Sequence, residues 1–287
     1  MRPVLKQNRI SRKLWILYLP IFLICIIGIG VALYFSGFQD ENLGAVIGIT
    51  SKDSEEEEQY NELKLEFNTL FTNQLEILQE GEINTQKLTN MYNELVVSAY
   101  NYQKSEENMT INVCIPQINI NDEIVFKFNK EIRDEYNERA KTLMKQVSTI
   151  NTVYSVGYRA YIQNNILSLA IRSEFKEGTK SQKVSIKTIN YNFAEKREVT
   201  AQEILNSKNI NSEQATKRIR NEIKSTQEQN QPLIDEGYQF YIRDYNSDRY
   251  NALNIKQFLY GKDGMLYIIY AYGNEEDTSE MDVIIFK

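Results

Sequence analysis

The chain has 287 residues, which is enough for one large or two small folded units with a hydrophobic core. Its 39 acidic residues outnumber its 33 basic residues, and this balance argues against a nucleic-acid partner, whose phosphates need clustered bases. The chain contains no histidine, which excludes the most frequent general base and zinc ligand, and we expect neither a metal nor another cofactor.

Residues 14–35, "LWILYLPIFLICIIGIGVALYF", carry no charge, and their number matches the roughly 20 apolar residues that cross a bilayer as a helix. Five bases and no acid precede them, which by the positive-inside rule keeps residues 1–13 in the cytoplasm and places residues 36–287 outside the cell. The small residues Ala32 and Ser36 leave a cleaved signal peptide as the alternative. The residues expected in the bilayer or at its interfaces are Leu14, Trp15, Tyr18, Pro20, Cys25, Tyr34 and Phe35.

The predicted anchor separates the charges of the chain. Because five of the 33 bases precede it, residues 36–287 carry 28 bases against 39 acids, a net charge of −11. Such a domain attracts basic proteins by electrostatic steering. Residues 36–53 contain glycines and mixed polar residues and are interpreted as a tether.

Residues 54–109 are predicted to form a helix and then the first strand of a hairpin. Ser54 and Glu57 have the spacing of a capping box, and an apolar stripe of helical period follows, at Tyr60, Leu63, Phe67, Leu70, Phe71, Leu75 and Leu78. This stripe favours a helix docked on its own domain over a self-associating stalk. Alternating apolar residues predict a hairpin over residues 93–119, with Pro116 ending its second strand and Cys114 as a free buried thiol.

Residues 110–287 mix helices and strands without regular alternation. A period of 3.6 predicts an amphipathic helix over 122–146 and another helix over 211–226, and Thr200 with Glu203 form a second capping box. The β-like segments are 153–163, 166–175, 184–193, 238–242, 255–260, 265–272 and 281–286, with a tight turn at 261–264. The predicted fold class is α+β, an antiparallel sheet packed with helices and preceded by one transmembrane helix.

Three segments resemble a family of bacterial exported domains. They are "INVCIPQINI" with the helix that follows, "NILSLAIRSEF" with "KTINYNFAEKREVTAQEIL", and "GKDGMLYIIYAYG". They are similar to the extracellular domain of the membrane anti-sigma factor that senses lysozyme, and to the accessory domain of some peptidoglycan deacetylases. The resemblance covers about residues 110–287. Where that family has a Gly-Gly-Ala-His turn, this chain has "KEGTKSQK", so ligand contacts from that turn do not carry over.

The resemblance implies a binding or sensing domain at the cell envelope that is not an enzyme. Its implied ligand is a basic protein such as lysozyme, or a peptidoglycan component. Residues 1–13 are too short to hold a sigma factor, so no sigma factor is expected as a partner. The lipid bilayer is the other expected partner. The alternatives are a carboxylate-dependent cell-wall hydrolase and a structural partner in an envelope complex.

The sequence offers few candidate ligand contacts. Glu174 and Glu177 flank one predicted turn and Asp263 lies in another, and a glycosidase needs two such carboxyls in a cleft. Tyr270 and Tyr272 belong to a group of aromatic residues that could stack on sugars. In turns, however, carboxylates are usually solvated, and aromatic residues in strands usually pack in a core. Residues 244–251 lack the central glycine and final glutamate of a calcium loop and are not interpreted as one.

Overall fold

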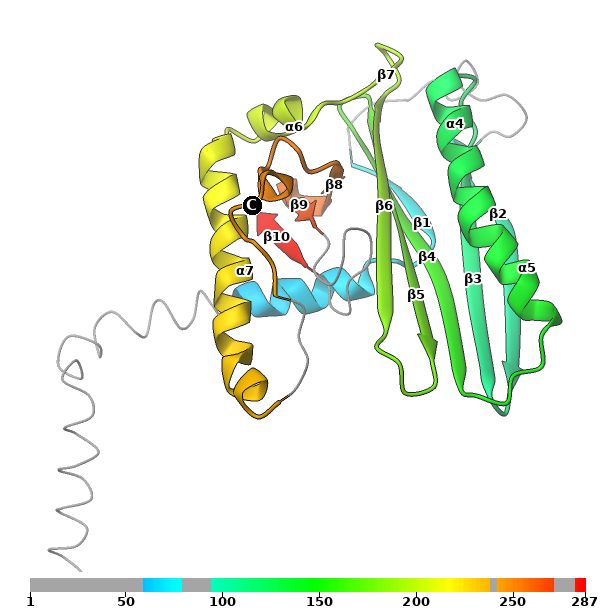
Figure 1. The fold of residues 1–287 in the computed structure, drawn as a ribbon. Coiled ribbons are helices and arrows are strands. Elements are labelled where there is room, and N and C mark those ends of the chain that lie inside the picture. The colour runs from blue at the N-terminus through cyan, green and yellow to red at the C-terminus, as the bar shows by residue number, and fades with distance from the viewer. Residues whose placement is uncertain (1–58, 79–93, 238–241, 271–281) are drawn as a thin grey trace, which may run out of the picture. The chain divides into compact units, whose positions relative to one another are not determined.

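Figure 1 shows a computed structural model of the chain, in which residues 59–78, 94–237, 242–270 and 282–287 are described. The predicted transmembrane residues 14–35 and the tether lie outside these residues. No helix of the described part is long and apolar enough to cross a membrane. Residues 61–287 form one compact unit, and the elements below belong to it.

The main sheet of the described residues has seven strands in the order β2-β3-β4-β5-β6-β7, with β1 also paired to β4. Their bounds are β1 (Gln74–Ile77), β2 (Val96–Glu106), β3 (Met109–Ile118), β4 (Thr152–Gln163), β5 (Ile166–Glu177), β6 (Lys183–Asn192) and β7 (Arg197–Glu198). The long strands β4, β5 and β6 form an antiparallel meander and agree with the sequence prediction to within two residues.

The prediction of a purely antiparallel sheet is wrong, because the main sheet is mixed. Both β1 and β3 run parallel to β4, β3 along Thr152–Val156 and β1 along Arg159–Ile162. The chain between β3 and β4 forms α4 (Glu123–Ile132), one π-helical turn (Arg133–Asn137) and α5 (Glu138–Lys145). This helical crossover is long enough to return the chain to the same end of the sheet, which a parallel pair requires.

The α4–α5 crossover covers one face of the main sheet (Figure 1). The core there contains alternate residues of the strands, such as Leu167, Leu169 and Ile171 of β5, against Val125, Phe128 and other residues of the helices. Asp122 caps α4 by accepting a hydrogen bond from the Ile124 amide at 2.9 Å. Period-two alternation in the strands and period 3.6 in the helix together explain why this core was predictable.

The opposite face of the main sheet meets a second antiparallel sheet of the order β10-β9-β8. Its strands are β8 (Gln257–Tyr260), β9 (Leu266–Ile269) and β10 (Val283–Phe286). It shares a core with α6 (Ala201–Ser207) and α7 (Ser212–Asp235), through Ile204, Ile219, Phe258 and Ile268 among others. Short 3₁₀ turns occupy Asp248–Tyr250 and Lys262–Gly264. The second of them is the predicted tight turn at 261–264, and its residue Asp263 has a left-handed backbone.

The helix predicted to continue to Leu78 ends instead at residue 69, and Leu75 lies in β1. Asn73 has a left-handed backbone with φ of 61°, its amide donates to Tyr158 O at 2.8 Å, and its side-chain oxygen accepts from Tyr158 N at 3.0 Å. This turn lets the chain join the edge of β4, so strand pairing prevails over the helical stripe.

Two further details differ from the prediction for the β2–β3 hairpin. Pro116 does not end β3, which continues to Ile118, because β4 pairs with β3 only up to Val113 and the partner strand bulges between Ser98 and Tyr100. A proline is tolerated where the ladder is interrupted in this way. Cys114 is a free buried thiol as predicted, and burial raises its pKa.

Candidate functional site

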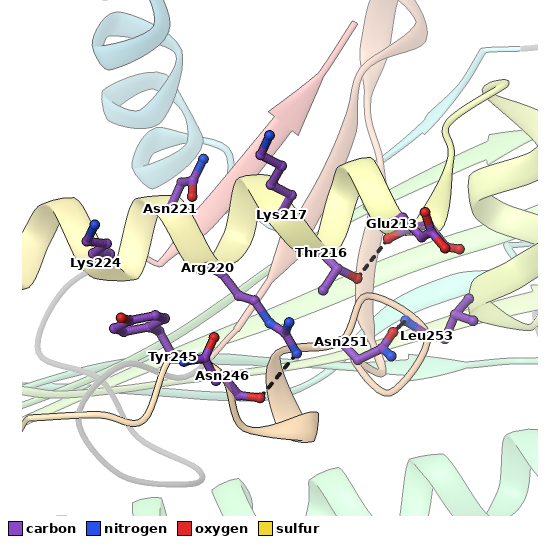
Figure 2. A pocket seen from close by; sticks show the side chains of 11 residues that line it. Glu213, Thr216, Lys217, Arg220, Asn221, Lys224, Tyr245, Asn246, Asn251 and Leu253 are labelled. Carbon is purple, nitrogen blue, oxygen red and sulfur yellow. Dashed lines mark hydrogen bonds between the residues drawn. The ribbon is translucent and has the colours of Figure 1, made fainter.

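An open groove with a volume of about 570 Å³ runs between α7 and the loop after it (Figure 2). Helix α7 contributes one wall, and residues 245–253 contribute the other. The groove is lined by Ser212, Glu213, Thr216, Lys217, Arg220, Asn221, Lys224, Tyr245, Asn246, Asn251 and Leu253. These side chains are mostly polar, so the groove suits a hydrophilic ligand.

The wall from α7 follows from helical periodicity. Asn211 caps the helix by accepting hydrogen bonds from the amides of Glu213 and Gln214, at 2.8 and 3.2 Å. Ala215, Ile219 and Ile223 recur every four residues and are fully buried against the second sheet. The positions one residue further along, at 216, 220 and 224, therefore form a neighbouring stripe that borders the groove.

Two of the hydrogen bonds between the loop and the helix lie at the groove. The Thr216 hydroxyl accepts from Ala252 N at 3.0 Å and donates to Ser212 O at 2.7 Å. Figure 2 shows Arg220 extending from α7 to the loop, where Nη2 donates to Asn246 O at 3.2 Å. The shape of the groove is therefore fixed by contacts at two successive turns of α7.

The lining is cationic although the chain as a whole is acidic. Lys217, Arg220 and Lys224 face a single acid of the lining, Glu213. Lys224 also forms an exposed ion pair with Glu228 at 3.6 Å, a type of pair that contributes little to stability. The Nε atom of Arg220 is buried and has no hydrogen-bond partner among the described residues.

Uncharged donors complete the lining of the groove. Asn221, Asn246 and Asn251 bring carboxamides, and Tyr245 brings an aromatic ring with a hydroxyl. Carboxamides and guanidinium groups bind carboxylates and the amide groups of glycans and peptides by hydrogen bonds. Since the lining holds one carboxylate, it lacks the pair of acids that a glycosidase uses. The arrangement can bind ligands that carry carboxylate and amide groups.

The structure does not bring the three predicted acidic contacts together at one site. Glu174 lies in β5, within the predicted strand 166–175. It pairs with Arg172 and accepts a hydrogen bond from the Ser155 hydroxyl at 3.3 Å. Glu177 ends the same strand and pairs with Lys180. Because strand side chains alternate, Glu174 and Glu177 point to opposite faces. Asp263 is exposed in its 3₁₀ turn.

The predicted aromatic contacts do not line the groove either. Tyr270 is buried in the core of the second sheet, and its ring meets that of Tyr250 edge-on at 6.4 Å. Tyr267, another aromatic residue of the predicted strand 265–272, is also buried, and burial raises its pKa to about 12. Tyr272 lies outside the described residues. Core packing therefore accounts for the two described tyrosines of this set.

Sequence reasoning missed the groove. The available signal was the three basic residues at spacing three and four on α7, next to the buried stripe. The second wall comes from a loop that begins after residue 241, and nothing in a local pattern indicates which helix that loop contacts.

No protein-family model and no curated protein matches the chain. Structural neighbours are DUF3298 family proteins. One, from Pseudomonas aeruginosa PAO1, is 10% identical with a TM-score of 0.32, over 59% of this chain and 78% of that one. Another, from Bacteroides fragilis NCTC 9343, is 13% identical with a TM-score of 0.31, over 62% of this chain and 80% of that one. The resemblance to the lysozyme-sensing family stays a prediction.

Proposed function

We propose that the chain is a membrane-anchored, non-catalytic binding domain of the bacterial cell envelope, whose α7 groove holds a polar, carboxylate-bearing component of the cell wall. The observation that carries this proposal is the lining of the groove, with three cations, three carboxamides and one acid. The anchor and the extracellular address come from the sequence of residues 1–35.

The groove favours one of the two ligand classes considered from the sequence. A basic protein such as lysozyme would meet Lys217, Arg220 and Lys224 with charges of the same sign, which opposes binding. Peptidoglycan stem peptides carry carboxylates, and its sugars carry acetamido groups, which together complement the cations and carboxamides of the groove. Peptidoglycan fragments are therefore the ligand that we propose.

Calorimetric titration of the full-length chain in lipid nanodiscs with purified muropeptides tests the proposal. We expect saturable binding, weakened about tenfold, or ~1.4 kcal/mol, by the double substitution Lys217→Ala and Lys224→Ala. Both lysines are exposed on α7, so their removal should leave the fold intact.

The matched control is the pair Lys127→Ala and Lys145→Ala, which removes the same charge from exposed positions of α4 and α5. If both double substitutions weaken muropeptide binding equally, the groove is not the binding site. Binding of lysozyme without binding of muropeptides would overturn the ligand class, and failure of both to bind would overturn the function. Release of muropeptides from intact peptidoglycan by the purified chain would show an enzyme instead.

A further inference from the structure

A second, much smaller cavity of about 70 Å³ lies where the β4–β5 turn meets the end of α6 and the end of β8. It is lined by Gln163, Asn164, Ile166, Ser207, Lys208 and Tyr260. One water molecule needs about 10–15 Å³ of such space, so this cavity has room for a small polar group. None of its residues lines the α7 groove.

The end of α6 fixes Lys208 at this cavity. Asn209 takes a left-handed backbone with φ of 55°, and Ile210 N donates to Leu205 O at 2.9 Å, which ends the helix at Ser207 with Lys208 as its C-cap residue. The Lys208 ammonium then lies 5.8 Å from the centre of the Tyr260 ring. Lys208 is half-buried as a result.

This ammonium lacks a counter-ion within the described residues, where no ion pair or hydrogen bond reaches it. Burial lowers its pKa, since the charged form loses hydration. The nearest acid of α6, Glu203, is occupied by Arg197 and by the Thr200 amide and hydroxyl. A half-buried cation that has no counter-ion among the described residues is stabilised by any anion that fits beside it.

The hydroxyls of the cavity are already ordered. Ser207 Oγ donates to Ile204 O at 2.7 Å and lies 2.9 Å from Tyr260 Oη, so the Tyr260 hydroxyl is the donor between these two. Burial raises the pKa of Tyr260 and keeps that proton in place. The donors that remain for a ligand are the Lys208 ammonium and the carboxamides of Gln163 and Asn164.

We infer that this cavity binds a carboxylate group, with Lys208 as its counter-ion and the carboxamides of Gln163 and Asn164 as further donors. A carboxylate matches these donors, because its two oxygens can accept hydrogen bonds from an ammonium and from carboxamides at the same time. The carboxylate can belong to a small free acid or to the C-terminus of a peptide. This inference does not depend on the function proposed for the α7 groove.

Nuclear magnetic resonance of the full-length chain with ¹³C-dimethylated lysines tests the inference. Loss of one signal in the variant Lys208→Met assigns that residue. Titration with sodium acetate should shift the Lys208 signal saturably and raise its titration midpoint, because a bound anion favours the charged amine. Sodium chloride at the same ionic strength and the Lys217 signal are the controls for screening.

Titrations with a dialanine peptide and with its C-terminal amide distinguish a small free acid from a peptide C-terminus as the source of the carboxylate. If the dipeptide saturates the Lys208 shift at a concentration at least tenfold below acetate, while its amide has no effect, the carboxylate is that of a peptide. If acetate and dipeptide act equally, the cavity takes any small carboxylate. Shifts that are linear in salt, uniform over all lysines, or equal for acid and amide would overturn the inference, as would undiminished acetate binding by folded Lys208→Met.

Discussion

At the scale of single residues, two short polar side chains join the two sheets. Ser168 and Asn190 face each other on β5 and β6, and both are buried. The Ser168 hydroxyl donates to Asn190 Oδ1 at 2.6 Å and accepts from Tyr260 N at 2.9 Å, while Asn190 Nδ2 donates to Phe258 O at 3.0 Å. Side chains of the main sheet thus satisfy backbone groups along the edge of β8, where a neighbouring strand would otherwise be needed.

We therefore expect Ser168→Ala to lower the free energy of unfolding by about 1–3 kcal/mol, because it leaves the buried amide of Tyr260 without its acceptor. Urea denaturation followed by circular dichroism measures this change. Ser181→Ala, in the exposed β5–β6 turn, removes the same hydroxyl without burial. If the two variants unfold at the same urea concentration, the network contributes nothing to the junction of the sheets.

At the scale of elements, α6 depends on the capping box that the sequence predicted. Thr200 Oγ1 accepts from Glu203 N at 3.3 Å, and Glu203 Oε2 accepts from Thr200 N at 2.9 Å. Arg197 adds two hydrogen bonds to the same carboxylate, at 2.9 and 2.6 Å. These contacts, led by Arg197, lower the pKa of Glu203 from 4.5 to about 2.

A carboxylate with a lowered folded-state pKa contributes stability above its unfolded-state pKa and loses that stability as the pH falls to the folded-state value. For Glu203 the window runs from about pH 4.5 down to about pH 2. We expect the melting temperature of the native chain to fall more steeply across this window than that of Glu203→Gln. Parallel curves for the two proteins, measured by calorimetry, would mean that the cap is not coupled to folding. Glu198→Gln on the neighbouring β7 is the control.

Strand β1 depends on a close approach at Gly157 of β4. A Cβ atom at this position would lie 2.9 Å from Phe71 O and 3.3 Å from Asn73 Oδ1. Gly157 lies just after the last β4 residue that pairs with β3 and just before those that pair with β1. Arg159 then holds β1 through Thr72, Gln74 and Glu76. Because Gly157 has no side chain, the edge of β4 can pair with β3 before this position and with β1 after it.

Gly157→Ala should displace residues 71–73 and weaken the pairing of β1, at a cost of about 1–3 kcal/mol. Amide hydrogen exchange resolves the effect along the chain. The amides of Asn73 and Leu78, which donate to β4 carbonyls at 2.8 Å, should exchange faster. The β4–β5 ladder serves as the internal control and should keep its protection. Unchanged exchange at Asn73 would show that the backbone shifts without losing β1.

At the scale of the whole molecule, the sequence predicted what is encoded locally. The alternation of β4, β5 and β6, the amphipathic crossover and the capping box of Thr200 and Glu203 all depend on residues within a few positions of each other. The partners of β4 depend instead on contacts between distant segments. Leu75 of β1 continues the apolar stripe that suits a helix, so only the pairing with β4 decides its structure.

The sequence did not predict the groove or the Lys208 cavity, because both depend on contacts between distant segments. Each combines residues separated by loops, such as Arg220 with Asn246 or Lys208 with Asn164. The predicted contacts Glu174 and Tyr270 were chosen for residue type alone, and the structure places them in a strand and in a core. Composition identifies residues capable of binding, whereas only tertiary contacts bring them to one place.

The parallel pairing of β1 has a consequence for the order in which the chain folds. Asn73 and Tyr158, which begin this pairing, are 85 positions apart. Closing so long a loop costs chain entropy, and contacts of this kind slow folding. During synthesis, β1 leaves the ribosome long before β4 exists, so it must wait until the β4–β5 meander has formed. Strand β1 is thus among the last of the described parts of the sheet to be completed.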